Sequence, residues 1–435
     1  MKRFLLLLSI PLWLGCGESG TPEWTYPDPS GSEASAEPSS EPSAEPDPSQ
    51  EPGTWPVLTG SFIQHWYPKV WTQARWDEEM STLAEVGITY LIYTPMSEDG
   101  GETDFRSLER CLKSAASHGV KVLVGPNAHS GWWGNPSGDW LNEQMQAGVE
   151  VAQAIYTRFH ASYPESLWGW YWDWEVDNVR WLLRRKDLAE AWNITLDGLT
   201  AIDPDMPLLF SPFMNTLGEA EDYGDFWSRL FPLLHLRHGD IFCPQDCVGA
   251  RGIAPEQVGP WLAAMKAAAD AVEGLRFWVN IEIFDMYTVG GSSWYATASL
   301  RRVLRQMEVA APYAEALVCF AYSHYFSPLL AGPDYHAAYR QYQQTGRLPE
   351  AGKLLPVNSV SRNDTASGAV LEWVVADKSG IAGVALYKNG SLLLKLPYRE
   401  ANFPTSFTEP AGKAADKYEI TTYNFLGDES AKVSF

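Results

Sequence analysis

The sequence predicts an α/β fold, a (β/α)8 TIM barrel followed by a small all-β immunoglobulin- or fibronectin type III-like sandwich. From residue 57 onward, short apolar runs alternate with amphipathic stretches, and eight such runs occur before residue 350. Alternating strands and helices indicate parallel strands with helical crossovers, and eight units match a (β/α)8 barrel. A doubly wound open sheet is the alternative, but it requires a Gly-rich phosphate loop after its first strand, which this sequence lacks.

The predicted barrel occupies residues 56–350. Its expected strands are the apolar runs 57–64, 88–95, 120–127, 167–175, 207–213, 240–246, 276–284 and 316–325. Amphipathic stretches between them predict helices, among them 76–87, 105–119, 140–159 and 256–274. Several of these stretches end in glycine just before the next strand, as helix C-termini commonly do.

Residues 356–435 have a different pattern. Short apolar runs at 369–375, 383–390, 391–397 and 418–425 are separated by turn residues such as Lys-Asn-Gly and Leu-Gly-Asp. This pattern and length predict a β-sandwich near the size of a fibronectin type III-like module. We expect this module to act in spacing or docking, because its sequence shows no group of reactive side chains.

The N-terminal 55 residues predict export and a tether. Residues 1–16 begin with Lys2 and Arg3, continue as an apolar run and end at Leu-Gly-Cys, which predicts a lipoprotein signal peptide with Cys16 as the lipidated residue. Ordinary secretion is the alternative. Residues 17–55 contain nine acids, eight prolines and no lysine or arginine, so they predict a disordered acidic linker. The expected location is the bacterial cell envelope, at the outer membrane or cell surface, with the lipid as membrane anchor.

Charge and cysteine content restrict the class of partner. The formal net charge is −22, so nucleic acid is not an expected partner. Cys111 and Cys319 fall in apolar helix and strand patterns and predict buried thiols, whereas pairing of Cys243 with Cys247 stays open. No metal-finger, HxH or HExxH spacing occurs, so we expect no metal and no cofactor. We expect the chain to be a monomer.

Two glutamates end two different predicted strands. In residues 167–175 the side chains of Tyr171, Asp173 and Glu175 share one face, opposite three tryptophans that we expect to pack outward. In residues 276–284, Asn280 and Glu282 repeat this arrangement. Active sites of (β/α)8 barrels lie at the C-terminal strand ends, and paired carboxylates are what glycoside hydrolysis requires.

The remaining strand ends supply further candidates. Asp246 is a candidate for proton transfer or for orienting a neighbour. Flat aromatic faces suit sugar rings, and Trp132 and Trp133 lie in a long loop after the third strand. The full set of predicted substrate-binding residues is Gln64, His65, Trp66, Asn127, His129, Trp132, Trp133, Tyr171, Asp173, Gln245, Asn280, Tyr322 and His324.

Structural roles are possible for all of these residues. Glu175 alone could form a salt bridge with Arg180, Arg184 or Arg185, and Trp132 and Trp133 could simply close the barrel mouth. His65, His129 and His324 could be structural histidines. The matched pair of glutamates favours catalysis over these alternatives.

Four ordered blocks resemble a family of mostly uncharacterised bacterial secreted and lipoprotein domains, grouped with glycoside-hydrolase TIM barrels. These blocks are Gly60-Ser61-Phe62-Ile63-Gln64 with Trp66, Gly169-Trp170-Tyr171 with Glu175, Gln245-Asp246-Cys247-Val248-Gly249, and Trp278-Val279-Asn280-Ile281-Glu282-Ile283-Phe284. The resemblance spans about residues 57–345 and implies a barrel with a link to carbohydrate.

A wider similarity is to retaining glycosidases of the cellulase-like clan. By position it implies Glu175 as acid/base and Glu282 as nucleophile, although Trp174 stands where that clan has asparagine. Together these features predict a surface-tethered glycoside hydrolase acting on an oligo- or polysaccharide. The alternative is a glycan-binding lipoprotein built on a catalytically inactive barrel.

Overall fold

A computed structural model of the protein describes residues 55–134, 136–216, 218–399 and 402–435. Residues 1–54 hold the predicted signal peptide, Cys16 and nearly all of the predicted linker, and they lie outside the described residues. Within the described part, no helix is both long enough and apolar enough to cross a membrane.

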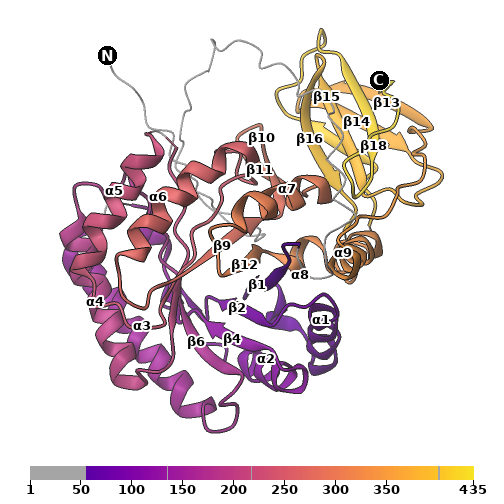
Figure 1. Cartoon of the computed structure of the whole chain (residues 1–435). Coiled ribbons are helices and arrows are strands. Elements are labelled where there is room, and N and C mark those ends of the chain that lie inside the picture. Colours follow the sequence, from indigo (N-terminus) through magenta and orange to yellow (C-terminus); the bar gives the residue numbers. More distant parts are fainter. Residues whose placement is uncertain (1–54, 135, 217, 400–401) are drawn as a thin grey trace, which may run out of the picture.

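Eight parallel strands close into a barrel surrounded by helices (Figure 1). In barrel order they are β1 (Leu58–Gln64), β12 (Ala316–Phe320), β9 (Arg276–Glu282), β8 (Ile241–Phe242), β7 (Leu208–Phe210), β6 (Leu167–Trp172), β4 (Lys121–Val124) and β2 (Tyr90–Thr94). The predicted fold class is confirmed, with one barrel strand in each of the eight predicted runs. Most strands end several residues before the predicted C-terminal limit, because the chain turns there into the loops that line the barrel mouth.

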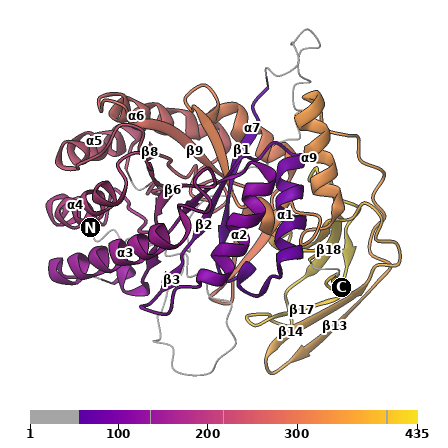
Figure 2. The same ribbon diagram turned by 90° about the horizontal axis from the view of Figure 1, so that it is seen from below.

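Helices cover the outside of the barrel, as Figure 2 shows from below. They are α1 (Gln73–Glu85), α2 (Phe105–His118), α3 (Gly138–Phe159), α4 (Arg185–Ile202), α5 (Ala220–Leu230), α6 (Val258–Asp270), α7 (Leu300–Ala310), α8 (Tyr322–Tyr325) and α9 (Pro333–Thr345). Short 3-10 turns are η1 (Pro68–Val70), η2 (Ser130–Trp133), η3 (Phe231–Leu233) and η4 (Pro255–Gln257). Gly119 ends α2 at a φ of 68°, a conformation that glycine adopts without a Cβ clash.

The barrel has an interior core and a second apolar layer between strands and helices. Side chains inside the barrel include Phe62, Tyr171 and Trp278. Trp172 points outward and stacks on Trp192 of α4, with ring centroids 3.7 Å apart. The outward packing predicted for Trp170 and Trp172 is therefore confirmed by the alternation along β6.

Between residues 359 and 434, the described strands form two antiparallel sheets with a common core. One has the order β13 (Ser359–Thr365), β14 (Gly368–Val374), β17 (Ser406–Glu409). The other has the order β16 (Ser391–Pro397), β15 (Gly383–Lys388), β18 (Tyr418–Tyr423), β19 (Val433–Ser434). These separate sheets confirm the predicted all-β C-terminal part.

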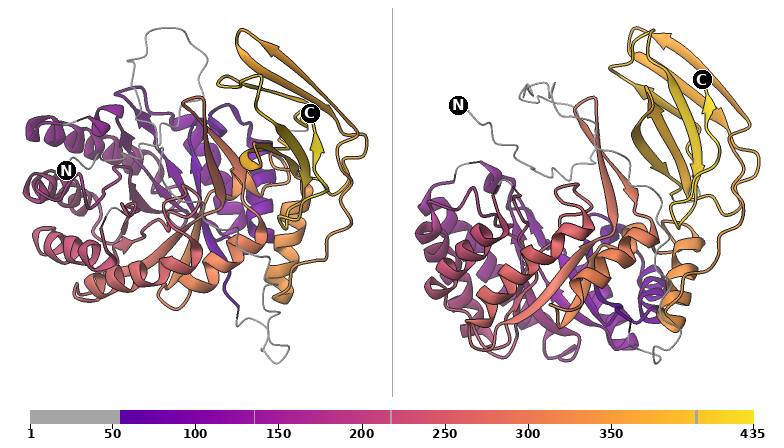
Figure 3. Two further views of the ribbon diagram at one scale, coloured as in Figure 1. Left: turned by 90° about the horizontal axis from the view of Figure 1, so that it is seen from above. Right: turned by 45° about the horizontal axis from the view of Figure 1, so that its top comes forward.

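Two short pairings extend the barrel mouth. The strands β3 (Ser97–Glu98) and β5 (Asn127–Ala128) pair in parallel just beyond β2 and β4. The hairpin β10 (Phe284–Val289) and β11 (Ser292–Thr297) follows β9 directly and projects from the barrel beside the C-terminal sheets (Figure 3).

Candidate active site

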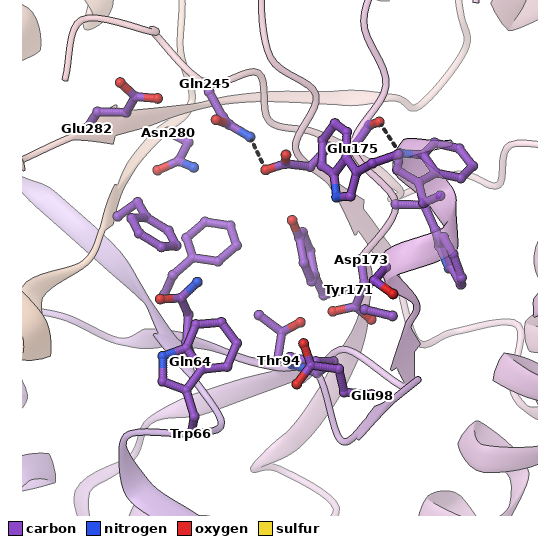
Figure 4. A pocket seen from close by; sticks show the side chains of 18 of the residues that line it. Gln64, Trp66, Thr94, Glu98, Tyr171, Asp173, Glu175, Gln245, Asn280 and Glu282 are labelled. Carbon is purple, nitrogen blue, oxygen red and sulfur yellow. Dashed lines mark hydrogen bonds between the residues drawn. The ribbon is translucent and has the colours of Figure 1, made fainter. Parts of the chain in front are cut away.

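A pocket of about 340 Å³ opens at the C-terminal ends of the barrel strands. This volume lies at the small end of the range usual for ligand sites. It is lined by Phe62, Gln64, Trp66, Thr94, Pro95, Glu98, Ala128, His129, Ser130, Trp132, Trp133, Tyr171, Asp173, Trp174, Glu175, Gln245, Asn280, Glu282, Phe284, Tyr295, Phe320 and Tyr325. Both predicted glutamates are on this wall, with Gln245 and Asn280 between them (Figure 4).

Glu175 is held by contacts to its side chain and to its backbone. Oε1 accepts a hydrogen bond of 2.9 Å from Nε2 of Gln245, and the same nitrogen donates to the carbonyl of Ser211. Nε1 of Trp132 donates to the backbone carbonyl of Glu175 at 2.8 Å. Arg184, one alternative partner, pairs with Asp187 at 3.2 Å. Glu175 thus has a neutral amide beside its carboxyl.

Glu282 ends β9 and lies under a tight backbone turn. Its Oε2 accepts a hydrogen bond of 2.7 Å from the backbone amide of Ala250. A Cβ at Gly249 would lie 2.4 Å from the carbonyl oxygen of Phe284 and 2.8 Å from Cβ of Glu282. Gly249 therefore allows the loop after β8 to approach Glu282 closely enough for this hydrogen bond.

Burial raises the pKa of both glutamates. For Glu175, burial outweighs the hydrogen bond from Gln245 and raises the pKa to about 7. For Glu282, burial and the nearby negative charge of Asp246 raise the pKa, against the amide of Ala250, which lowers it. The charge of Glu175 adds to the rise, so the two pocket carboxyls influence each other. Such a pair holds a proton at neutral pH, as acid–base catalysis requires.

Asp246 does not line the pocket. Its Oδ2 accepts a hydrogen bond of 2.6 Å from Nε2 of Gln306, and its Oδ1 accepts hydrogen bonds of 3.2 Å from the backbone amides of Val248 and Glu282. This carboxyl is buried behind Glu282 and holds the backbone of β9. We therefore do not retain Asp246 as a candidate for direct proton transfer to a substrate.

Several polar atoms on the pocket wall are buried without a hydrogen-bond partner among the described residues. They are Oδ1 of Asn280, the hydroxyl of Tyr295, which has the hydroxyl of Ser293 nearby, and the carboxyl oxygens of Asp173, which have the backbone amides of Asn127 and Asp173 nearby. Burial raises the pKa of Asp173 well above its ordinary value. Buried polar groups are seldom left unpaired, so those that can reach the cavity are candidates to bind the hydroxyl groups of a ligand.

Four predicted substrate-binding residues lie away from the pocket lining. His65 contacts the hydroxyl of Tyr93, with Nδ1 and oxygen 3.0 Å apart, and Asn127 donates to the carbonyl of Gln144. The hydroxyl of Tyr322 hydrogen-bonds His336, and His324 is buried against Tyr67. Because these side chains contact the protein rather than the cavity, we leave them out of the proposed site.

The two predicted stacking tryptophans differ in exposure. Trp132 is 2% exposed and packs against Trp174 and Trp181, so its main contact is with the loop that carries Glu175. Trp133 and Trp66 are only partly buried and keep more of their rings accessible. Trp174, expected to pack outward, also lines the pocket because the regular strand ends at Trp172.

The sequence did not point to several other lining residues. Thr94 and Glu98 come from the end of β2 and from β3, and Glu98 faces the cavity in Figure 4. Tyr295 comes from the hairpin. Phe284 of the fourth ordered block and Tyr325 at the end of the last predicted strand also line the pocket, from the hairpin and from α8. A glutamate within a Gly-rich loop, Glu98 in Ser-Glu-Asp-Gly-Gly, was the one available signal.

The structure also shows the state of the four described cysteines and whether side chains group as metal ligands. Cys111, Cys243, Cys247 and Cys319 are buried free thiols. Cys243 and Cys247 therefore do not pair, and the burial predicted for Cys111 and Cys319 is confirmed. Within the described ranges, no three His, Cys, Asp or Glu side chains group so as to hold a metal ion.

A comparison with family models gives one match, the "Domain of unknown function (DUF4434)", over residues 58–332. The chain belongs to this family. The match covers most of the barrel and all four ordered blocks that the sequence singled out. No curated protein matches this DUF4434 chain.

Solved structures similar to the DUF4434 chain include glycosidase-like barrels. A Bacteroides thetaiotaomicron VPI-5482 protein, described as a proposed alpha-L-fucosidase, aligns with a TM-score of 0.57 and 17% identity over 69% of this chain and 99% of that one. The xylanase TsXylA of Thermoanaerobacterium saccharolyticum aligns with a TM-score of 0.41 and 13% identity, over 63% and 88% of the two chains. At 17% identity, the likeness to the first structure shows the fold alone.

Proposed function

We propose that this DUF4434 protein is a glycoside hydrolase that cleaves an oligo- or polysaccharide with Glu175 and Glu282. One observation carries the proposal: two buried carboxyls with raised pKa face a single aromatic pocket at the C-terminal ends of β6 and β9. Glycoside hydrolysis requires one protonated and one ionised carboxyl on either side of the scissile bond.

The division of roles follows the positional similarity to retaining glycosidases. The reactive form of the enzyme has Glu282 ionised and Glu175 protonated, although the pKa of Glu282 is the higher of the two. In this form Glu282 attacks the anomeric carbon while the bond to the leaving oxygen breaks and Glu175 donates its proton to that oxygen. Water then attacks the glycosyl ester, Glu175 takes a proton from it, and Glu282 is released. Gln245 keeps Glu175 oriented throughout, and the amide of Ala250 stabilises ionised Glu282.

Neutral sugars suit this pocket better than acidic ones. Glu98, Asp173, Glu175 and Glu282 line it, and none of the described lining residues is a lysine or arginine. A uronate or sulfated sugar would therefore enter beside carboxyls without a counter-ion, which is unfavourable in a desolvated site. The rings of Trp66 and Trp133 offer apolar faces on which a neutral sugar can stack.

The proposal also includes a tether. The signal-like residues 1–16, Cys16 and the acidic linker support a lipid-anchored protein of the bacterial cell envelope, with the barrel held away from the membrane. The domain limits 56–350 and 356–435, the fibronectin type III-like relationship and the monomeric state are part of the same proposal.

The experiment is a glycan panel that records reducing-end release and binding together. We expect wild-type protein to release sugar from a neutral glycan, Glu175→Gln and Glu282→Gln to lose that release while still binding, and the exposed Glu143→Gln of α3 to match wild type. Binding without release in the wild type, unchanged in both pocket variants, would instead identify a glycan-binding protein.

Azide should restore turnover in Glu175→Ala and Glu282→Ala. The anomer of the glycosyl azide product should be inverted for the nucleophile variant and retained for the acid/base variant.

A further inference from the structure

The C-terminal domain reaches the wall of the pocket through the side chain of Arg399. Arg399, between β16 and β17, places its guanidinium over the ring of Tyr325 with 5.0 Å to the centroid. It also interacts with Tyr67, whose ring stacks on His324 at 3.9 Å. Tyr325 lines the pocket, so a residue far along the chain lies directly behind the cavity wall.

The contact continues to the strand that carries Glu282. Tyr325 stacks on Phe284 with centroids 5.7 Å apart, and Phe284 is two residues after Glu282 at the start of β10. The carbonyl of Phe284 accepts a hydrogen bond of 2.6 Å from Nη2 of Arg302. Arg399, Tyr325 and Phe284 therefore form a continuous stack that ends beside the glutamate.

The hairpin of β10 and β11 connects the same two parts of the molecule. Tyr287, Val289 and Ala296 belong to the core of the C-terminal sheets, whereas Tyr295 and Phe284 line the pocket. Near the tip, Trp294 packs edge-on against Phe407 with 5.3 Å between centroids. The hairpin is thus one structure with a face in each domain, as its position in Figure 3 suggests.

From these contacts we infer that the C-terminal sandwich is part of the substrate-binding unit, with Arg399 as a positioning residue for Tyr325. A spacing module would not require a half-buried cation against the pocket wall. Nη2 of Arg399 is buried without a hydrogen-bond partner among the described residues, so the removal of this cation from water is offset by its interactions with the side chains of Tyr67 and Tyr325 and by its position over the Tyr325 ring. Loss of this cation frees Tyr325 to leave the stack and weakens ring packing against a bound sugar.

The main test rests on the proposed function and measures steady-state kinetics. Arg399→Ala should raise KM about fivefold to tenfold with kcat changed less than about threefold, the size expected for one desolvated cation–π contact. Arg399→Lys should recover most of the loss because it keeps the cation. Lys378→Ala, which removes an exposed cation–π contact over Phe403 at 5.2 Å away from the pocket, should match wild type.

A double variant separates positioning from general stability. If Arg399 acts through Tyr325, then Arg399→Ala should add little to the KM of Tyr325→Ala. Full additivity, an unchanged KM in folded Arg399→Ala, or the same loss in Lys378→Ala would each overturn the inference.

Amide hydrogen exchange tests the contact without any substrate. Arg399→Ala should speed exchange in peptides covering α8 and the hairpin, whereas peptides from α4 should be unchanged. Unchanged exchange in α8 would overturn the inference even if the protein is a hydrolase. Faster exchange in a protein that releases no sugar would support the contact between Arg399 and Tyr325 and would contradict only the proposed function.

Discussion

Oδ1 of Asp246 accepts a hydrogen bond of 3.2 Å from the backbone amide of Glu282. The buried carboxyl of Asp246 therefore fixes the backbone of the residue that carries the second buried carboxyl, Glu282. The same carboxyl raises the pKa of Glu282 through its negative charge. Asp246 therefore influences both where Glu282 lies and how readily it ionises, without a place on the pocket wall.

Asp246→Asn tests these two effects together. Asparagine keeps the size of the side chain, and Oε1 of Gln306, buried without a partner in the described structure, can accept from the new amide if Gln306 turns over, with loss of the hydrogen bond from Nε2 of Gln306 to the carbonyl of Glu282. Removing the negative charge lowers the pKa of Glu282, so we expect the bell-shaped pH profile of kcat/KM to move to lower pH. A profile unchanged from wild type would contradict the electrostatic role.

Gln245→Leu should move the profile in the opposite direction. The amide of Gln245 donates to Glu175 and lowers its pKa, so its loss leaves burial unopposed and raises the pKa further above about 7. Protonated Glu175 then persists to higher pH, and the alkaline limb should move upward. Profiles of Asp246→Asn and Gln245→Leu that shift the same way would exclude this account.

Local patterns predicted the fold and part of the site. The alternation in residues 167–175 and 276–284 depends on neighbouring residues alone, so it placed Tyr171, Glu175, Asn280 and Glu282 on one edge of the barrel. The family match over residues 58–332 agrees with the four blocks from which the resemblance was drawn.

Site residues on turns and on the short strands outside the barrel could not be predicted from the alternation of side chains along a strand. We extended the last strand to residue 325, which would put Tyr322 and His324 on the inner face, but β12 ends at Phe320 and the helical turn α8 follows. That turn sends Tyr322 toward His336 and places Tyr325 on the pocket wall. The positions of Tyr295 and Arg399 at the pocket depend on contacts between segments that are distant in the sequence, and the periodicity of a single segment does not predict such contacts.

Glu175→Gln should stabilise the protein at alkaline pH while it removes activity. The folded-state pKa of about 7 lies above the ordinary 4.5, so the folded state holds the proton more tightly than the unfolded state. Ionisation of Glu175 therefore costs stability as pH rises from about 4.5 to about 7, up to about 3 kcal/mol above that range. Chemical denaturation should show the variant more stable at pH 8 and equal to wild type near pH 4; equal stability at both would contradict the raised pKa.

Trp192→Ala should be among the most destabilising single substitutions in the barrel. The Trp192 ring is fully buried in α4 and stacks on Trp172, whose strand continues into the segment that carries Glu175. Removing it leaves a cavity behind β6, which should lower the free energy of unfolding by about 3–5 kcal/mol. Denaturant titration measures this loss, with Leu183→Ala as the matched control: Leu183 is 94% exposed just before α4, and its truncation should change stability by no more than about 0.5 kcal/mol. Comparable losses in the two variants would show that the packing of Trp192 against Trp172 is not what stabilises this side of the barrel.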